Sequence, residues 1–80
     1  MDKSPFAKDE LKLQSLLREL REKAGLRQQD VADAVGEPQS FVSKYETGER
    51  RLDILELRAI CTALGISLTS FVKRLEQRLS

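Results

Sequence analysis

Apolar residues recur three or four positions apart along almost the whole chain, which is the spacing of one face of a helix. The first such series starts after about residue 9 and consists of Leu13, Leu16, Leu17, Leu20 and Ala24. Gly25 follows, and glycine often ends a helix because it adopts a left-handed backbone at the least cost. The pattern predicts a first helix over residues 9–24, preceded by an N-terminal arm of residues 1–8.

Two short segments come next, and the residues at their ends predict that both are helices. Residues 28–35 form the first of them, and Gly36 is placed to leave it with a positive φ angle. Pro38 suits a first helical turn, where the missing N–H has no partner, so a third helix is predicted from near residue 38 to before Gly48. Ala32 lies where a larger side chain would force these two helices apart.

Two more helices complete the prediction. Asp53 and Glu56 are spaced as in a capping box and begin a fourth helix that closes at Gly65, and Ser67 is placed to cap a fifth. Their apolar stripes are Ile54, Leu57, Cys61 and Leu64 in the fourth helix, and Leu68, Phe71, Val72, Leu75 and Leu79 in the fifth. No segment alternates apolar and polar residues for long enough to form a strand. The predicted fold class is all-α, with five helices in a single domain over residues 9–80.

The composition narrows the possible functions. Cys61 is the only cysteine, so no intrachain disulfide is possible, and its place on an apolar stripe predicts a buried thiol. The chain has no histidine, second thiol or glycine-rich phosphate loop, so we expect no enzyme, no metal site and no cofactor. No apolar run is as long as a membrane span, and the N-terminus lacks a signal-peptide pattern. A cytoplasmic protein without membrane contact is predicted.

The charge of the chain gives little support to nucleic-acid binding, because the net charge is only +1. Between residues 27 and 51, the basic residues are Arg27, Lys44, Arg50 and Arg51, and the acidic ones are Asp30, Asp33, Glu37, Glu46 and Glu49. The local sum is slightly negative. Any contact with DNA must therefore depend on where the charges lie.

The third predicted helix carries a polar face. Its outward residues are Gln39, Ser40, Phe41, Ser43 and Lys44, opposite Val42 and Tyr45. A helix that its partner holds out from a small core, with such a face outward, has the shape that enters a DNA major groove. The simpler alternative is a solvated helix face without a binding role. For Phe41 two alternatives stay open: it fills the space between the second and third helices, or it stands exposed for DNA.

A larger set of residues carries a resemblance to a known family. The set is Leu20, Arg21, Gly25, Leu26, Gln28, Ala32, Gly36, Ser40, Val42, Ser43, Tyr45, Glu46, Gly48 and the run from Leu64 to Ser67. With these residues the chain resembles the phage-repressor and Cro-like helix-turn-helix proteins, also called the XRE family. The resemblance implies a compact, lambda-repressor-like DNA-binding domain of five helices. Helices 2 and 3 would form the helix-turn-helix, and the third would read bases.

The resemblance also implies roles for single residues. Gln28 is expected to donate a hydrogen bond to a phosphate and to brace Gln39. Gln39 and Ser40 are expected to meet base edges first, and Ser43 and Lys44 to complete the readout one turn later. Glutamine can pair bidentately with adenine, and lysine can pair with guanine.

Other residues are expected to hold the protein on DNA without reading bases. Arg50 and Arg51 would bind phosphate beyond the third helix, and an exposed Phe41 would pack on thymine methyl groups. Arg27 replaces the Ser or Thr that usually caps the second helix, and a cation there opposes the helix dipole. A phosphate contact is the simplest compensation for it. Glu37 departs from the family pattern by placing a negative charge near the expected phosphates.

Two further groups have structural roles in this interpretation. Glu46 is expected to form a partly buried ion pair with Arg21 rather than to contact DNA. In the fifth helix, some apolar residues have no obvious partner within the chain, and an exposed apolar stripe normally marks an interface. These residues, the predicted homodimer interface, are Val72, Leu75 and Leu79.

The predicted function is that of a sequence-specific DNA-binding transcriptional regulator, most simply a repressor. It would bind double-stranded DNA at a two-fold operator as a homodimer, with the third helix in the major groove. The alternative is an antitoxin-type protein-binding module on the same scaffold, whose main partner is a toxin. The near-zero net charge favours that alternative somewhat. A purely structural helical bundle that binds neither is a third possibility.

Overall fold

The computed structural model describes residues 5–80 and contains five helices within them. They are α1 (Ala7–Lys23), α2 (Gln28–Val35), α3 (Gln39–Thr47), α4 (Ile54–Leu64) and α5 (Leu68–Leu79). The described part of the chain has no strand, so the predicted all-α fold with five helices is confirmed. The first helix starts at Ala7, inside the predicted arm of residues 1–8. Residues 1–4 of that arm lie outside the described residues.

The helix ends follow from local hydrogen bonds. Gly36 ends α2 with φ 75°, a left-handed conformation that any residue with a Cβ adopts only at a cost. Asp53 and Glu56 form the predicted capping box, in which the Glu56 N–H donates to Asp53 at 2.8 Å and the Asp53 N–H donates to Glu56 at 3.0 Å. Ser67 accepts from the Ser70 N–H at 3.0 Å. These contacts explain why α2, α4 and α5 have the predicted limits.

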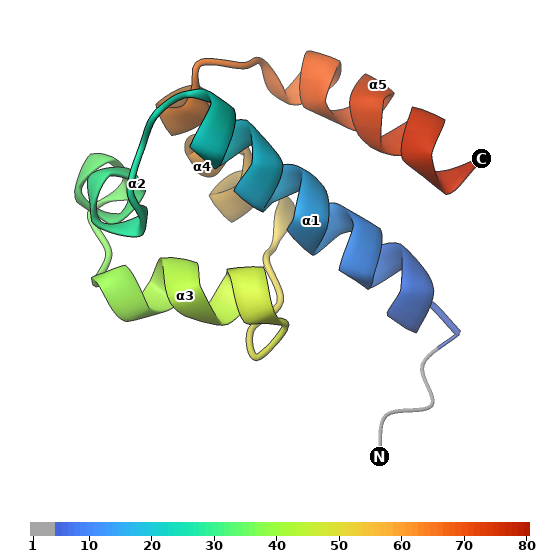
Figure 1. Cartoon of the computed structure of the whole chain (residues 1–80), viewed down its shortest axis with the longest axis horizontal. Coiled ribbons are helices and arrows are strands. Elements are labelled where there is room, and N and C mark those ends of the chain that lie inside the picture. Colours follow the sequence, from blue (N-terminus) through green and yellow to red (C-terminus); the bar gives the residue numbers. More distant parts are fainter. Residues whose placement is uncertain (1–4) are drawn as a thin grey trace.

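The helices surround a central α1 (Figure 1). Both α3 and α5 contact α1, α2 contacts α3 and α4, and α4 also contacts α5. In Figure 1, α1 runs between α5 on one side and α3 on the other, and α2 and α4 together link the two sides. This arrangement leaves one long face of α3 without a neighbouring helix.

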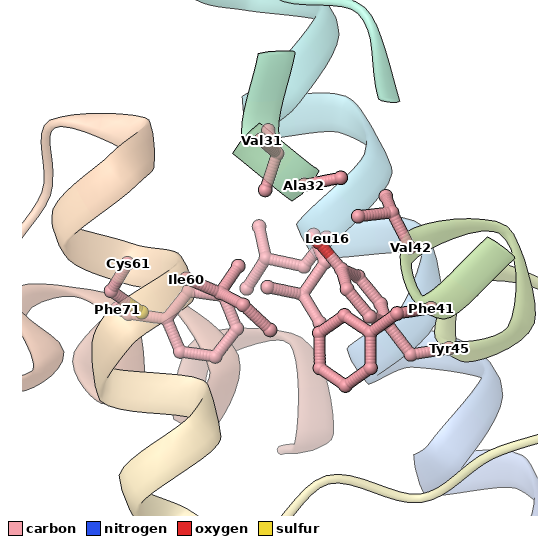
Figure 2. Packing of buried hydrophobic residues seen from close by; sticks show 10 residues of the cluster. Leu16, Val31, Ala32, Phe41, Val42, Tyr45, Ile60, Cys61 and Phe71 are labelled. Carbon is pink, nitrogen blue, oxygen red and sulfur yellow. The ribbon is translucent and has the colours of Figure 1, made fainter. Parts of the chain in front are cut away.

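Ten buried residues form the core, and every helix contributes to it (Figure 2). They are Leu16 and Leu17 of α1, Val31 and Ala32 of α2, Phe41, Val42 and Tyr45 of α3, Ile60 and Cys61 of α4, and Phe71 of α5. Ala32 is fully buried, so a larger side chain there would have to displace its neighbours in the core. Burial raises the pKa of the Cys61 thiol to about 11, so the thiol is protonated at neutral pH.

Three details of the predicted apolar faces are wrong. Ala24, the last residue of the first apolar series, is exposed and follows the end of α1. Ile54 was expected on the buried face of α4 but is 59% exposed, because the core contacts α4 only from Leu57 onward. Leu75 of α5 was expected to lack a partner within the chain, but it packs against the buried core. Val72 of the same helix is exposed, as predicted.

Within residues 5–80, no single helix has the length and apolar character that a membrane span requires. Only α4 and α5 taken together meet that test, by length and composition alone, and a bend of 101° separates them.

Candidate nucleic-acid interface

Helix α3 has one buried and one exposed side. Phe41, Val42 and Tyr45 point into the core, where Figure 2 shows them beside Leu16. On the other side, Gln39, Ser40 and Lys44 are exposed and Ser43 is half-buried. The helix is short, and the pairing of α2 with α3 at the turn fixes its orientation. The structure thus brings four of the predicted base-contacting residues together on one outward surface.

Phe41 is not part of that surface. Only 7% of the residue is exposed, and its ring lies edge-on to Tyr45 with 5.5 Å between ring centroids. The guanidinium carbon of Arg50 lies 4.7 Å from the centroid of the Phe41 ring. The prediction that Phe41 packs on thymine methyl groups is therefore corrected: its side chain fills the core, and Arg50 covers it.

Behind the surface lies the predicted ion pair between Arg21 of α1 and Glu46 of α3, which is confirmed. Arg21 donates twice to the carboxylate, from Nε to Oε2 at 2.7 Å and from Nη2 to Oε1 at 3.0 Å. The two side chains are 11% and 3% exposed. Arg21 also donates to the Leu26 carbonyl at 2.9 Å. The hydrogen bonds from Arg21 to Glu46 raise the pKa of Arg21, so the cation is held firmly beside its partner.

Two glutamines extend this ion pair to the protein surface. The Nε2 amide of Gln28 donates to Glu46 Oε1 at 3.0 Å, and the Nε2 amide of Gln39 donates to Gln28 Oε1 at 2.6 Å. The second hydrogen bond confirms that Gln28 braces Gln39. The link from Gln28 to Glu46 was not predicted from the sequence. We call the connected side chains of Arg21, Glu46, Gln28 and Gln39 the polar relay.

Arg27 has a partner of its own. Its guanidinium donates to Asp30 at 3.1 Å and 2.7 Å, and its backbone N–H donates to the same carboxylate at 2.7 Å. These contacts hold the pKa of Asp30 at about 2, well below its ordinary value. The Asp30 carboxylate thus offsets the unfavourable positive charge of Arg27 at the start of α2. The spacing of three residues between Arg27 and Asp30 could have indicated this pair from the sequence. The Arg27 side chain remains largely exposed.

The two arginines of the loop between α3 and α4 are also paired. Arg50 donates to both oxygens of Glu56, at 3.0 Å and 2.7 Å, and to the Arg51 carbonyl at 2.9 Å. Arg50 is the main reason why the pKa of Glu56 is lowered to about 2. Arg51 pairs with Glu10 of α1 at 2.9 Å. A phosphate contact by either arginine therefore competes with a carboxylate that the chain itself supplies.

Lys44 differs from these arginines, because it is exposed on α3 and makes no ion pair within residues 5–80. Its ammonium group is available for an outside partner. The same part of the chain contains no group of three or more His, Cys, Asp or Glu residues that could hold a metal ion.

Comparisons with known proteins agree with this geometry. The family model described as helix-turn-helix matches residues 17–71. No match was found among curated proteins. Among solved structures, an XRE-family like protein from Pseudomonas syringae pv. tomato str. DC3000 is 38% identical, with a TM-score of 0.84. That match covers 91% of this chain and 89% of the other.

The restriction-modification controller protein C.Esp1396I has a similar fold. Its tetramer in complex with its natural 35 base-pair operator is 25% identical, with a TM-score of 0.79 and coverage of 86% of this chain and 91% of that one. A mutant of it bound to its highest affinity operator site is 26% identical, with the same TM-score and coverage. Since the family model spans most of the chain and one relative is 38% identical over nearly its whole length, this chain belongs to the XRE family of helix-turn-helix DNA-binding regulators.

Proposed function

We propose that this protein is a sequence-specific transcriptional repressor that acts in the cytoplasm and has no enzymatic activity. It binds a two-fold operator as a homodimer and inserts α3 into the major groove of each half-site, with the half-sites about one helical turn, roughly 34 Å, apart. The observation that carries the proposal is the outward polar side of α3, where Gln39, Ser40 and Lys44 are exposed beside the half-buried Ser43.

The chemistry of that side suits the edges of bases. Gln39 offers a donor and an acceptor, Ser40 and Ser43 offer hydroxyl groups, and Lys44 adds a cation without an internal partner. Gln28 is the first residue of α2, where backbone N–H groups and the helix dipole attract an anion, so its proposed phosphate contact is made by the backbone N–H, since its side-chain amide is held by Glu46 and Gln39. A controller protein of similar fold is bound to its operator in solved structures, which supports DNA as the partner.

The loop arginines and Arg27 have supporting roles in the proposal. Each is exposed and paired with a carboxylate, and a surface ion pair is worth little in water. Arg27, Arg50 and Arg51 therefore exchange their carboxylates for phosphate when DNA arrives. Arg50 is the most restricted of the three, since it also lies over the Phe41 ring.

The proposed homodimer interface lies on α5 and comprises Val72, Leu75 and Leu79. Val72 is 39% exposed, whereas Leu75 packs partly against the core of its own chain. A charge at Val72 consequently tests the interface without opening the core. We expect Val72→Glu to be monomeric in sedimentation at micromolar concentration, and Gln77→Glu, which adds the same charge elsewhere on α5, to remain dimeric. Dimers of Val72→Glu would contradict this interface.

The proposed function is tested by selecting genomic fragments that bind the protein and measuring their affinity for a double variant, Gln39→Ala with Lys44→Ala. We expect the wild type to select related sequences with two-fold symmetry, and the double variant to fold normally and lose that selectivity. Specific binding should weaken steeply as salt rises. Equal affinity of the wild type for selected and random DNA would contradict the proposal.

One observation favours the second candidate, an antitoxin-type module whose main partner is a toxin. Of the cations near α3, only Lys44 lacks a carboxylate partner within residues 5–80, which weakens the attraction of this surface for DNA. In that case, the double variant at Gln39 and Lys44 would retain a co-purifying protein partner and lose only DNA binding. Loss of both partners together would argue against it.

A further inference from the structure

We propose that Glu46, which is buried and does not face DNA, determines the base preference of Gln39 by fixing the orientation of two amide groups. Glu46 acts as a positioning residue through Gln28. The proposal rests on the proposed function for its DNA readout, but the orientation itself is a property of the free protein. It is carried by the uninterrupted hydrogen bonds from Glu46 to Gln28 and from Gln28 to Gln39, at 3.0 Å and 2.6 Å.

The ion pair sets the order of donors and acceptors along the polar relay. An ionised carboxylate can only accept hydrogen bonds, and Arg21 can only donate them. Glu46 Oε1 accepts from both Arg21 and Gln28, each at 3.0 Å. Gln28 must therefore turn its nitrogen toward Glu46 and its oxygen toward the protein surface.

The orientation of the Gln28 amide determines the orientation of the Gln39 amide. The outward oxygen of Gln28 accepts, so Gln39 must face it with the nitrogen, as the structure shows. One N–H of Gln39 is then occupied, while its other N–H and its oxygen remain for a partner outside the chain. A glutamine that was free to rotate would offer its donor and acceptor in either order. The polar relay allows only one order.

That fixed order matters for base recognition in the major groove. Adenine presents the N7 acceptor beside the N6 donor, whereas guanine presents the two acceptors N7 and O6. A bidentate contact with adenine needs a donor opposite N7 and an acceptor opposite N6, in that order. A bidentate contact of this kind is worth about 1–3 kcal/mol, or roughly 5- to 150-fold in affinity between bases. Reversal of the Gln39 amide places like groups opposite each other and removes this preference.

The substitution Glu46→Gln tests this directly, because the new side chain has nearly the same shape but contains a donor. Arg21 and Gln28 both donate to the Oε1 position, and the new amide can place either its oxygen or its NH₂ group there. Gln28 can then face position 46 with either end of its own amide, so Gln39 can donate or accept and the single order is lost. The matched control is Arg21→Lys, which weakens the ion pair but leaves an acceptor-only carboxylate at Glu46.

The readout is the ratio of affinities for operators that differ only at the base contacted by Gln39. That position is the one at which Gln39→Ala loses discrimination. A ratio does not depend on the fraction of folded protein, so a loss of stability does not alter it. We expect the preference for adenine to fall to less than about threefold in Glu46→Gln and to remain at the wild-type value in Arg21→Lys. In the Gln39→Ala background, Glu46→Gln should have no further effect on the ratio.

Two results overturn the proposal: a wild-type ratio in Glu46→Gln, or an equal loss of the ratio in Arg21→Lys. If Glu46→Gln fails to fold, Gln28→Met replaces it, because this variant breaks the polar relay and leaves the ion pair in place. Gln28→Met should lose the preference at the Gln39 position while keeping the preferences at other positions. Retention of the preference at the Gln39 position would overturn the proposal.

A measurement on the free protein separates this proposal from the proposed function. NMR signals of the Gln39 side-chain NH₂ group report whether it donates a hydrogen bond. We expect them to move toward those of the exposed Gln77 in Glu46→Gln and to stay in place in Arg21→Lys. Unchanged Gln39 signals in Glu46→Gln overturn the proposal even if the protein binds DNA. Shifted signals in a protein that selects no DNA sequence support the polar relay and overturn only the proposed function.

Discussion

Arg21 and Arg51 each pair with a glutamate from a distant part of the chain, but the Arg21 pair is buried and the Arg51 pair is exposed to solvent. The pair of Arg21 with Glu46 is 11% and 3% exposed and continues into two glutamines. The pair of Arg51 with Glu10 is 67% and 29% exposed, and the loop of Arg51 directly follows α3. Burial thus decides whether an arginine is a fixed part of the fold or a group that can exchange its partner. The first pair supports α3 from behind, and in the proposed function the second pair is given up to a phosphate.

The largest effect should come from breaking the buried pair. Glu46→Ala leaves the Arg21 cation without a partner in a site that water hardly reaches, which typically costs about 3–5 kcal/mol. The free energy of unfolding, measured by urea denaturation, should fall by an amount in this range. A loss below about 1 kcal/mol would show that the pair behaves like a surface contact and would contradict the comparison.

An intermediate effect should come from the carboxylates that hold Arg27 and Arg50. The pKa values of Asp30 and Glu56 are lowered to about 2 in the folded protein. A lowered pKa means that the ionised group stabilises the fold above its unfolded pKa, and that this stability is lost as the pH falls toward the folded value. We expect the urea midpoint to fall between about pH 5 and pH 2. In Glu56→Gln the fall should be shallower, starting from a lower midpoint at pH 7; identical pH profiles for the two proteins would contradict the assignment.

The smallest effect on stability should come from Arg51→Ala, because an exposed pair contributes little to folding. Its effect should appear in DNA binding instead. If Arg51 exchanges Glu10 for a phosphate, the slope of log affinity against log salt should become shallower by about 0.9 for each bound protomer. Arg18→Ala, which removes an exposed arginine paired with Glu22, is the control with an unchanged slope. An unchanged slope in Arg51→Ala would show that this loop does not touch the DNA backbone.

The sequence predicted the parts of this molecule that local rules determine. The limits of α2, α4 and α5 follow from Gly36, from the Asp53 capping box and from Ser67, each of which acts within a few residues of the helix end. The predicted start of α1, at about residue 9, is two residues later than the observed start at Ala7, because the apolar stripe begins only at Leu13. A periodic pattern shows the face of a helix better than its ends.

Contacts between distant residues were predicted unevenly. The family resemblance supplied the pairing of Arg21 with Glu46 and the bracing of Gln39, both of which the structure contains. It did not supply the partners of the loop arginines, since a loop has no periodicity from which a neighbour on another helix could be inferred. Phe41 shows the same limit: an aromatic residue beside two polar ones fits either side of a short helix, and only the packing of the other helices decides.

The most direct test of the account is a map of NMR shift changes when the protein binds a selected operator fragment. In the proposed complex, the outward side of α3 lies on the bases and the start of α2 lies beside it on the DNA backbone. We expect the largest shift changes at Gln39, Ser40 and Lys44, smaller ones at Gln28, and almost none along the exposed side of α1. The largest changes on α1 or α4, with α3 unaffected, would contradict it.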